Sequence, residues 1–135
     1  MQTLMGDLTI ELEDHPGTLA KATEAIAKAG INIEGAAGFP CGGMGVFHVL
    51  TKDAKATRKA LESAGYKITG ERQALAIDVE DKPGTAAKIF RKIADASVNV
   101  DLVYEATNNR LVVGGDNVQR IKEILEREPT AASRM

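Results

Sequence analysis

The sequence contains one segment twice, 67 positions apart, and this repeat limits the possible folds more than any other feature. When residues 8–34 are aligned without a gap to residues 75–101, 13 of the 27 positions are identical. Each copy contains the motif Glu-Asp-x-Pro-Gly-Thr, at residues 13–18 and at residues 80–85. Self-similarity at a fixed period indicates one structural unit used twice. We therefore predict two small domains, residues 1–72 and residues 73–135.

The overall composition is that of a soluble globular protein. Of the 135 residues, 44% are hydrophobic and 27% are charged, and the apolar runs are far shorter than the roughly 20 residues that span a bilayer. No leader pattern opens the sequence, and a lone Cys41 fits a reducing compartment. The net charge of −2 shows no basic stretch for nucleic acid. We expect a cytoplasmic protein that binds neither membrane nor nucleic acid.

The first copy shows alternating periods of strand and helix. Leu8, Ile10 and Leu12 alternate with polar residues, which predicts a strand after a short lead-in over residues 1–7. A helix should follow the Pro-Gly turn and end at Gly30, where a left-handed cap fits. The later elements expected are a strand from Ile31, then a frayed strand end and a long loose hairpin loop over 35–45. A strand over 46–51, a helix capped by Asp53 over 54–64 and a strand over 66–69 should follow.

The second copy repeats this order with a shorter hairpin turn over residues 107–109, a strand over 110–114 and a final apolar helical stripe from Val118 to Leu125. Residues 128–135 show no strand pattern, so its last strand should be weak or absent. The order β-α-β-β-α-β predicts an α+β fold: two tandem ferredoxin-like units, each an antiparallel sheet with both helices on one face.

Residues that could support catalysis are scattered. His15 and His48 lie in different segments without a Cys or carboxylate at metal-ligand spacing, and Cys41 has no base beside it in the sequence. The glycine-rich residues 42–45 lack the Lys-Ser/Thr of a phosphate-binding loop. We predict no enzyme activity, no cofactor and no metal site.

The repeated turn is the better candidate for binding. The first N–H groups of a helix lack partners at its positive end and favour an anion. Gly17 and Gly84 would let a ligand approach those groups, and Asp14 or Asp81 could bind an ammonium group. Such a pair suits a zwitterion. The alternative is that Pro-Gly only starts a helix and that the aspartates stabilise the turn.

Asparagine occupies matching positions in the two copies. Asn32 and Asn99 each interrupt β-branched residues, where asparagine is a poor strand former. A cap or bulge after the helix would explain them. Their recurrence also fits an amide that donates to and accepts from a small polar ligand.

The motif, the alanine-rich helix and the hydrophobic-Asn-hydrophobic triplet together resemble the ACT domain, a small regulatory module that senses amino acids. The second copy is similar to the paired ACT domains of aspartokinase. The resemblance implies that residues 1–72 and 73–135 are each an ACT domain and that ligands bind between domains. It points to these ligand-binding residues: Asp14, His15, Pro16, Gly17, Thr18, Asn32, Ile33, Asp81, Gly84, Thr85, Asn99 and Val100.

The leading hypothesis is a regulatory protein that binds a small amino acid and signals to a partner enzyme or regulator. We expect a homodimer or higher homo-oligomer, because units of this size have small cores and exposed sheet edges. The alternative is a ligand-free structural module that joins chains through its sheet edges. An RNA-binding domain is disfavoured, because the third strand of each copy lacks surface aromatic residues with Lys or Arg.

Overall fold

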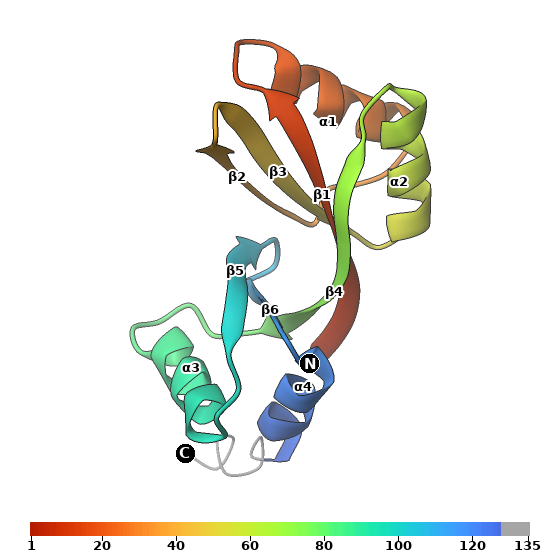
Figure 1. Cartoon of the computed structure of the whole chain (residues 1–135). Helices are drawn as coiled ribbons and strands as arrows, with labels where there is room; N and C mark the ends of the chain where they lie inside the picture. The colour runs from red at the N-terminus through yellow and green to blue at the C-terminus, as the bar shows by residue number, and fades with distance from the viewer. Residues whose placement is uncertain (128–135) are drawn as a thin grey trace. The chain divides into compact units, whose positions relative to one another are not determined.

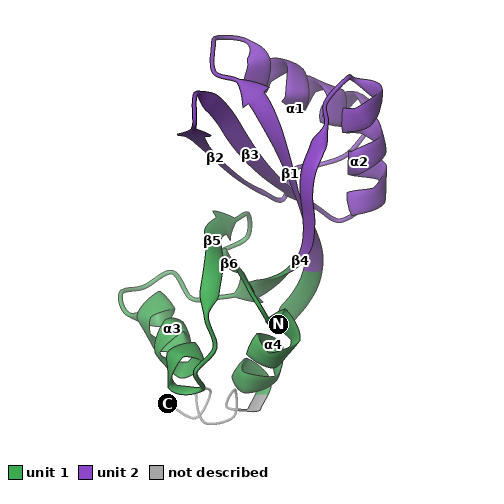
Figure 2. Ribbon diagram, in the orientation of Figure 1, with its two compact units in different colours: residues 1–4, 74–135 green, residues 5–73 purple. Residues whose placement is uncertain are grey.

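A computed structural model of the chain describes residues 1–127, which form four helices and an antiparallel arrangement of six strands (Figure 1). The elements are β1 (Gln2–Glu13), α1 (Thr18–Lys28), β2 (Gly35–Cys41), β3 (Met44–Thr51), α2 (Ala54–Ser63), β4 (Ile68–Asp78), α3 (Thr85–Asp95), β5 (Val100–Ala106), β6 (Arg110–Gly115) and α4 (Val118–Arg127). They divide into two compact units, shown in Figure 2. We call residues 5–73 the N-terminal unit, and residues 1–4 with 74–135 the C-terminal unit.

The N-terminal unit packs two helices against one face of its sheet. In β1, Leu8, Ile10 and Leu12 alternate with more exposed residues, so all three point to the same face. Both helices contribute to the core on that face, α1 through Ile26 and α2 through Leu61. The central strand β1 pairs antiparallel with β3, which pairs in turn with β2. The predicted α+β class, with antiparallel strands and helices on one face, is therefore found here.

The glycine-rich segment after α1 is a regular strand, so the prediction of a long loose loop over 35–45 is wrong. All of Gly35–Cys41 pairs with β3, and only Gly42 and Gly43 form the turn. Both glycines have positive φ, 61° and 85°, which a two-residue hairpin turn between twisted strands requires. The glycines make the hairpin tight because they adopt this conformation at little steric cost.

The second strand starts later than the sequence predicts. Residues 31–34 are not strand, and β2 begins only at Gly35. Likewise Asn99 precedes β5, which begins at Val100. Both asparagines therefore lie in the connection between helix and strand.

The C-terminal unit repeats the same packing. The end of β4 pairs with β6, and β6 pairs with β5. Leu75 and Ile77 of β4 face α3 and α4, which contribute Ile93 and Ile121 to the core. The predicted short turn over 107–109 is confirmed: Asn108 and Asn109, which tolerate this conformation, have φ of 63° and 53°.

The first residues of the chain complete the C-terminal unit. Strand β1 already begins at Gln2, so the expected lead-in over residues 1–7 is wrong, and residues 1–4 belong with residues 74–135. The Asp78 amide donates to the Met1 carbonyl over 3.0 Å, and the Asp78 carboxylate lies 3.3 Å from the terminal ammonium group. Leu4 packs against the core of this unit. These residues lie beside β4, where a βαββαβ unit has its fourth strand.

The division into domains over residues 1–72 and 73–135 stays a prediction, and the two compact units do not follow a single cut in the sequence. The N-terminal unit ends at Gln73 and the C-terminal unit resumes at Ala74, inside the continuous strand β4. The first four residues of the chain belong to the C-terminal unit. A sequence pattern could not show this, because the pairing joins residues more than seventy positions apart. The predicted weak or absent strand in 129–135 lies outside the described residues.

The predicted cap of α2 is confirmed. The Asp53 carboxylate accepts a hydrogen bond from the Ala56 amide at 2.9 Å and caps α2. None of the helices in residues 1–127 has both the length and the apolar character needed to cross a membrane.

We predict that Leu4→Ala destabilises the C-terminal unit. Removing most of a partly buried leucine side chain should lower the free energy of unfolding by about 2 kcal/mol, the low end for a core truncation. Hydrogen exchange should show faster exchange at the amides of Val112 and Val113, both buried in β6. Thr3→Ala, at an exposed neighbouring position, is the control. Unchanged protection in β6 would contradict this role of the N-terminus.

Candidate functional site

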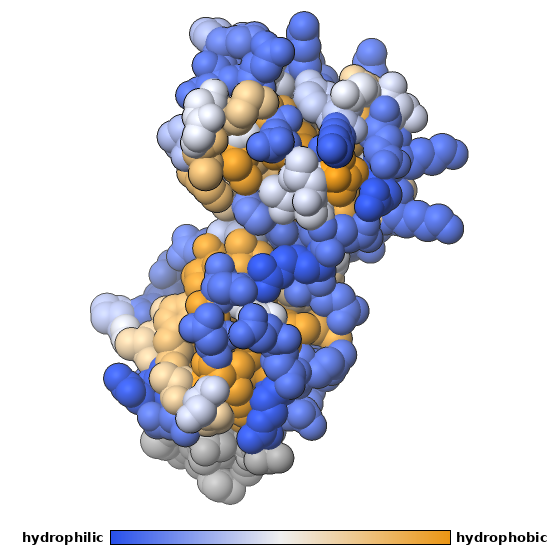
Figure 3. All heavy atoms as spheres, viewed as in Figure 1, coloured by the Kyte–Doolittle hydropathy of each residue, from blue (hydrophilic) through white to orange (hydrophobic). Residues whose placement is uncertain are grey.

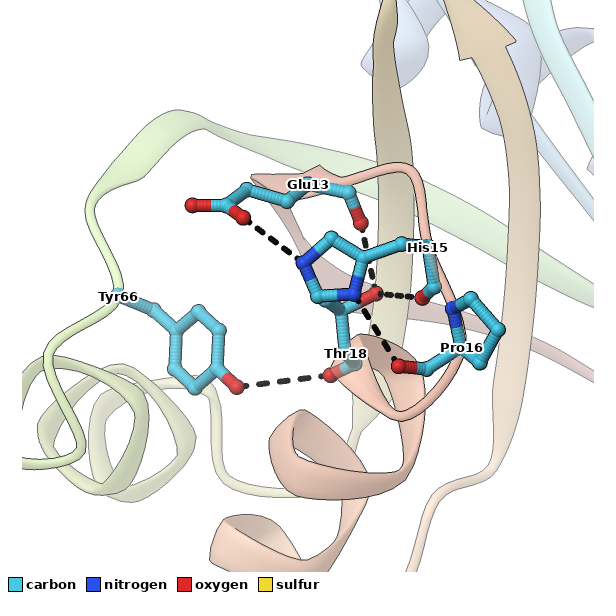
Figure 4. A network of polar contacts seen from close by, with 5 residues as sticks. All are labelled: Glu13, His15, Pro16, Thr18 and Tyr66. Carbon is cyan, nitrogen blue, oxygen red and sulfur yellow. Dashed lines mark hydrogen bonds and ion pairs between the residues drawn. The ribbon is translucent and has the colours of Figure 1, made fainter.

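The repeated turn connects the first strand to the first helix in both units. In the N-terminal unit the Thr18 hydroxyl lies 2.7 Å from the Glu13 carbonyl and 3.1 Å from the His15 carbonyl, both of which accept from it (Figure 4). The Tyr66 hydroxyl donates to the Thr18 carbonyl at 3.5 Å. These hydrogen bonds hold the start of α1 against the end of β1, so the turn has a defined conformation.

The glycine of each turn is needed for the backbone. Gly17 and Gly84 have φ of 95° and 90°, in the left-handed region, and no side-chain hydrogen bond caps the helix that follows either one. A Cβ at either position would meet nothing within 4 Å. The backbone conformation therefore requires glycine here, in addition to the ligand access expected from the sequence. The uncapped amides leave the positive end of each helix available to an anion.

His15 bridges two hydrogen-bond acceptors on the surface of the turn. Its Nδ1 lies 3.1 Å from the Pro16 carbonyl, and its Nε2 lies 2.8 Å from a Glu13 carboxylate oxygen (Figure 4). A neutral imidazole has only one N–H, so only the imidazolium can donate to both. The Pro16 carbonyl and, next, the Glu13 carboxylate accordingly raise the pKa of His15.

A pocket of about 440 Å³ lies beside this turn, between the start of α1 and the β2–β3 hairpin. Three predicted site residues line it: Asp14, His15 and Thr18. Pro16 and Gly17 shape the turn and do not line the pocket. The other lining residues were not identified from the sequence: Leu12, Glu13, Leu19, Ala36, Ala37, Gly38, Phe39, Pro40, Gly45, Val46 and Phe47.

A second pocket occupies the equivalent place in the C-terminal unit, with a volume of about 210 Å³. The predicted residues Asp81 and Thr85 line it, whereas Gly84 and Val100 do not. Lys82 replaces His15 in the repeat and lies 3.2 Å from Glu80. The Thr85 hydroxyl is buried without a hydrogen-bond partner, unlike that of Thr18. The two turns therefore share a backbone but differ in side-chain contacts.

The structure does not bring the predicted asparagines to the turn of their own unit. Asn32 and Ile33 line a separate hollow of about 390 Å³ beside α1, which contains none of the turn residues. The Asn32 amide donates to the buried Glu34 carboxylate at 2.9 Å. Asn99 lies just before β5, with its carbonyl close to Gly115. Within one unit the predicted residues thus form two groups, one at the turn and one beyond the helix.

Metal chemistry receives no support from the geometry. In residues 1–127, no three His, Cys, Asp or Glu side chains gather in an arrangement that could hold a metal ion. The Cys41 thiol is exposed and in no disulfide.

Comparison with known proteins places these features in a family. The family model of the ACT domain matches residues 7–64, a range within the N-terminal unit. Residues 7–64 are therefore similar to the ACT domain family. The resemblance inferred from the sequence is thereby confirmed.

Curated relatives of the chain include two aspartokinases. The aspartokinase of Corynebacterium glutamicum is 46% identical over 57 residues, which are 42% of this chain and 12% of the relative. That of Corynebacterium efficiens is 46% identical over 54 residues, 40% of this chain and 11% of the relative. The chain therefore matches only about an eighth of the length of these enzymes.

Solved structures share the fold over most of the chain. Protein BT0572 from Bacteroides thetaiotaomicron has a TM-score of 0.84 at 24% identity, covering 94% of this chain and 90% of that one. The regulatory subunit of aspartate kinase from Thermus thermophilus has a TM-score of 0.68 at 17% identity, covering 93% and 95%. At these identities the likeness establishes the fold alone.

The N-terminal unit should contain a titrating imidazole, His15, whose pKa lies above the ordinary value of 6.5. Because the folded pKa is raised, this contact stabilises the fold below about pH 6.5 and its contribution is lost as the pH rises through the folded pKa. NMR titration of His15 should show the raised midpoint, and Glu13→Gln should lower it. Glu80→Gln, the matching change in the other unit, should not. A titration midpoint of His15 that stays unchanged in Glu13→Gln would contradict the contact between His15 and Glu13.

Proposed function

We propose that the chain is a non-catalytic regulatory protein that senses a small amino acid, with its principal ligand site in the ACT domain. One observation carries this proposal: the pocket beside α1 joins an uncapped helix start, a carboxylate and an apolar wall. Its volume of about 440 Å³ falls within the roughly 300–1,000 Å³ typical of small-molecule sites.

The chemistry of the pocket suits a zwitterion. The amides at the start of α1 would receive the α-carboxylate, because the positive end of a helix favours an anion. The Asp14 carboxylate would accept hydrogen bonds from the ammonium group, and the hairpin would contact the side chain. Nothing in this arrangement activates a nucleophile or a water molecule, in keeping with a sensor.

We further propose that the C-terminal unit is a second ACT domain. The repeated motif, the same strand order and the pocket at the equivalent turn support this. The smaller volume of its pocket favours the N-terminal unit as the principal site.

A regulatory role would require a partner protein that responds to the bound ligand. The 46% identity to parts of two aspartokinases, and a structural neighbour described as a regulatory subunit, support signalling to a partner enzyme. The Asn32 and Asn99 groups would then complete the pockets of neighbouring domains, since neither reaches the turn of its own unit.

We expect one of the twenty amino acids to raise the melting temperature, since a ligand at 100 times its Kd adds roughly 2.7 kcal/mol of stability. Asp14→Asn should weaken binding roughly tenfold or more, because a charged hydrogen bond contributes about 1.5–3 kcal/mol. Asp81→Asn is the matched control and should leave this affinity unchanged. Calorimetry measures both. Changing Asp14 avoids the backbone strain that a new side chain at Gly17 would introduce.

The proposal fails if no amino acid stabilises the protein or if Asp14→Asn binds as the parent does. Loss of binding on Asp81→Asn alone would place the principal site in the C-terminal unit.

We also expect the chain to form a homodimer or a higher homo-oligomer. Units of fewer than 75 residues bury only a modest share of their surface, so association adds needed burial. Two structural neighbours are described as subunits of aspartate kinase. Light scattering over a dilution series should give a mass of at least two chains at tens of micromolar. A constant monomer mass would exclude this assembly.

A further inference from the structure

The two equivalent pockets differ in the size and charge of their lining residues, and this difference indicates which class of amino acid each could bind. Resting on the proposed function, we infer that the pocket of the N-terminal unit takes an α-amino acid with a branched aliphatic or aromatic side chain, and that the pocket of the C-terminal unit does not.

The register of the strands shows which pocket residues correspond. Gly38 pairs with Phe47 in the first hairpin, and Glu105 pairs with Leu111 in the second. One pair further towards the turn, Phe39 pairs with Val46. Its counterpart is the pair formed by Ala106 and Arg110. The 67-residue repeat adds one more match, between Leu19 and Ala86. Five lining positions can therefore be compared directly.

In the N-terminal unit these positions form an apolar wall. Leu19 comes from the first turn of α1 and Phe39 from β2, and both line the one pocket while remaining 49% and 48% exposed. Val46 and the buried Phe47 extend the wall along β3. In the space-filling view, hydrophobic residues reach the surface of the N-terminal unit over β2 and β3 (Figure 3). A ligand side chain that covers Leu19 and Phe39 would gain roughly 25 cal/mol for each Å² of apolar surface buried.

In the C-terminal unit four of these five positions are small or charged, and Leu111 stands in place of Phe47. Ala86 and Ala106 replace the two large side chains, while Glu105 and Arg110 replace a glycine and a valine. The Arg110 guanidinium donates to the Thr107 carbonyl at 2.8 Å and to the Thr107 hydroxyl at 3.0 Å, which holds its position. An apolar ligand here would remove water from charged groups without giving them a partner, and this is unfavourable.

The polar end of the N-terminal pocket excludes acidic ligands. Glu13 and Asp14 both line it, and the nearby cation, His15, is already bound to Glu13. A ligand with a second carboxylate would face these two like charges. Charge thus reinforces the preference for an apolar side chain.

Calorimetry on the full chain tests this with leucine, phenylalanine, serine and aspartate as probes. Leucine or phenylalanine should bind roughly tenfold or more tightly than serine or aspartate, because each buried methylene contributes favourably. The double variant Leu19→Ala with Phe39→Ala gives the pocket the residues of the C-terminal unit at both positions. It should lose most of this preference. Val103→Ala removes an apolar side chain of the same exposure, 48%, that lines neither pocket, and should keep it.

The possible failures are distinguishable. If none of the twenty amino acids binds, the proposed function and this inference fall together. If serine or aspartate binds as tightly as leucine and phenylalanine, or if the double variant keeps the preference, the inference is wrong and the sensor function stands. Circular dichroism confirms folding of the variants, which is expected because both side chains are half exposed.

Discussion

Each unit reverses direction between its first strand and its first helix within a few residues, and a glycine with positive φ makes that reversal possible. The turn sets where the helix begins and therefore which of its residues reach the sheet. It also leaves the helix start without a side-chain cap, at the edge of a pocket. Folding and the proposed binding thus depend on the same few residues, which would account for a motif that recurs intact although much of the surrounding sequence differs.

The two units show how one backbone supports two kinds of site. The residues shared between the copies determine the backbone: proline, the left-handed glycine and the threonine of the turn, with the alternating core residues of the first strand. Each pocket is lined both by shared residues of the turn and by residues that differ between the copies. Phe39 and Val46 on one hairpin correspond to Ala106 and Arg110 on the other, so the scaffold is constant while charge and volume change. The residues that would set ligand specificity are therefore those of the hairpin, while the turn residues set the backbone.

The N-terminus illustrates a contact that local patterns do not reveal. Met1 bonds to Asp78, and Leu4 joins a core built otherwise from residues after 74. The copy that lacks a recognisable fourth strand in its own sequence is completed by residues from the start of the chain. Such pairing is non-local, so its loop-closure entropy must be overcome during folding before the contact becomes favourable.

The sequence by itself determined the features that depend on neighbouring residues. Leu8, Ile10 and Leu12 alternate, Asp53 caps a helix and Asn108 lies in a tight turn, because side-chain period, capping and positive φ are local properties. The sequence also located the turn that carries Asp14. Only the tertiary structure decided that Gly35–Cys41 is a strand, that Asn32 lies away from that turn, and that Phe39 and Leu19 form one wall. Those outcomes depend on strand register and on packing between distant segments, which no window of sequence contains.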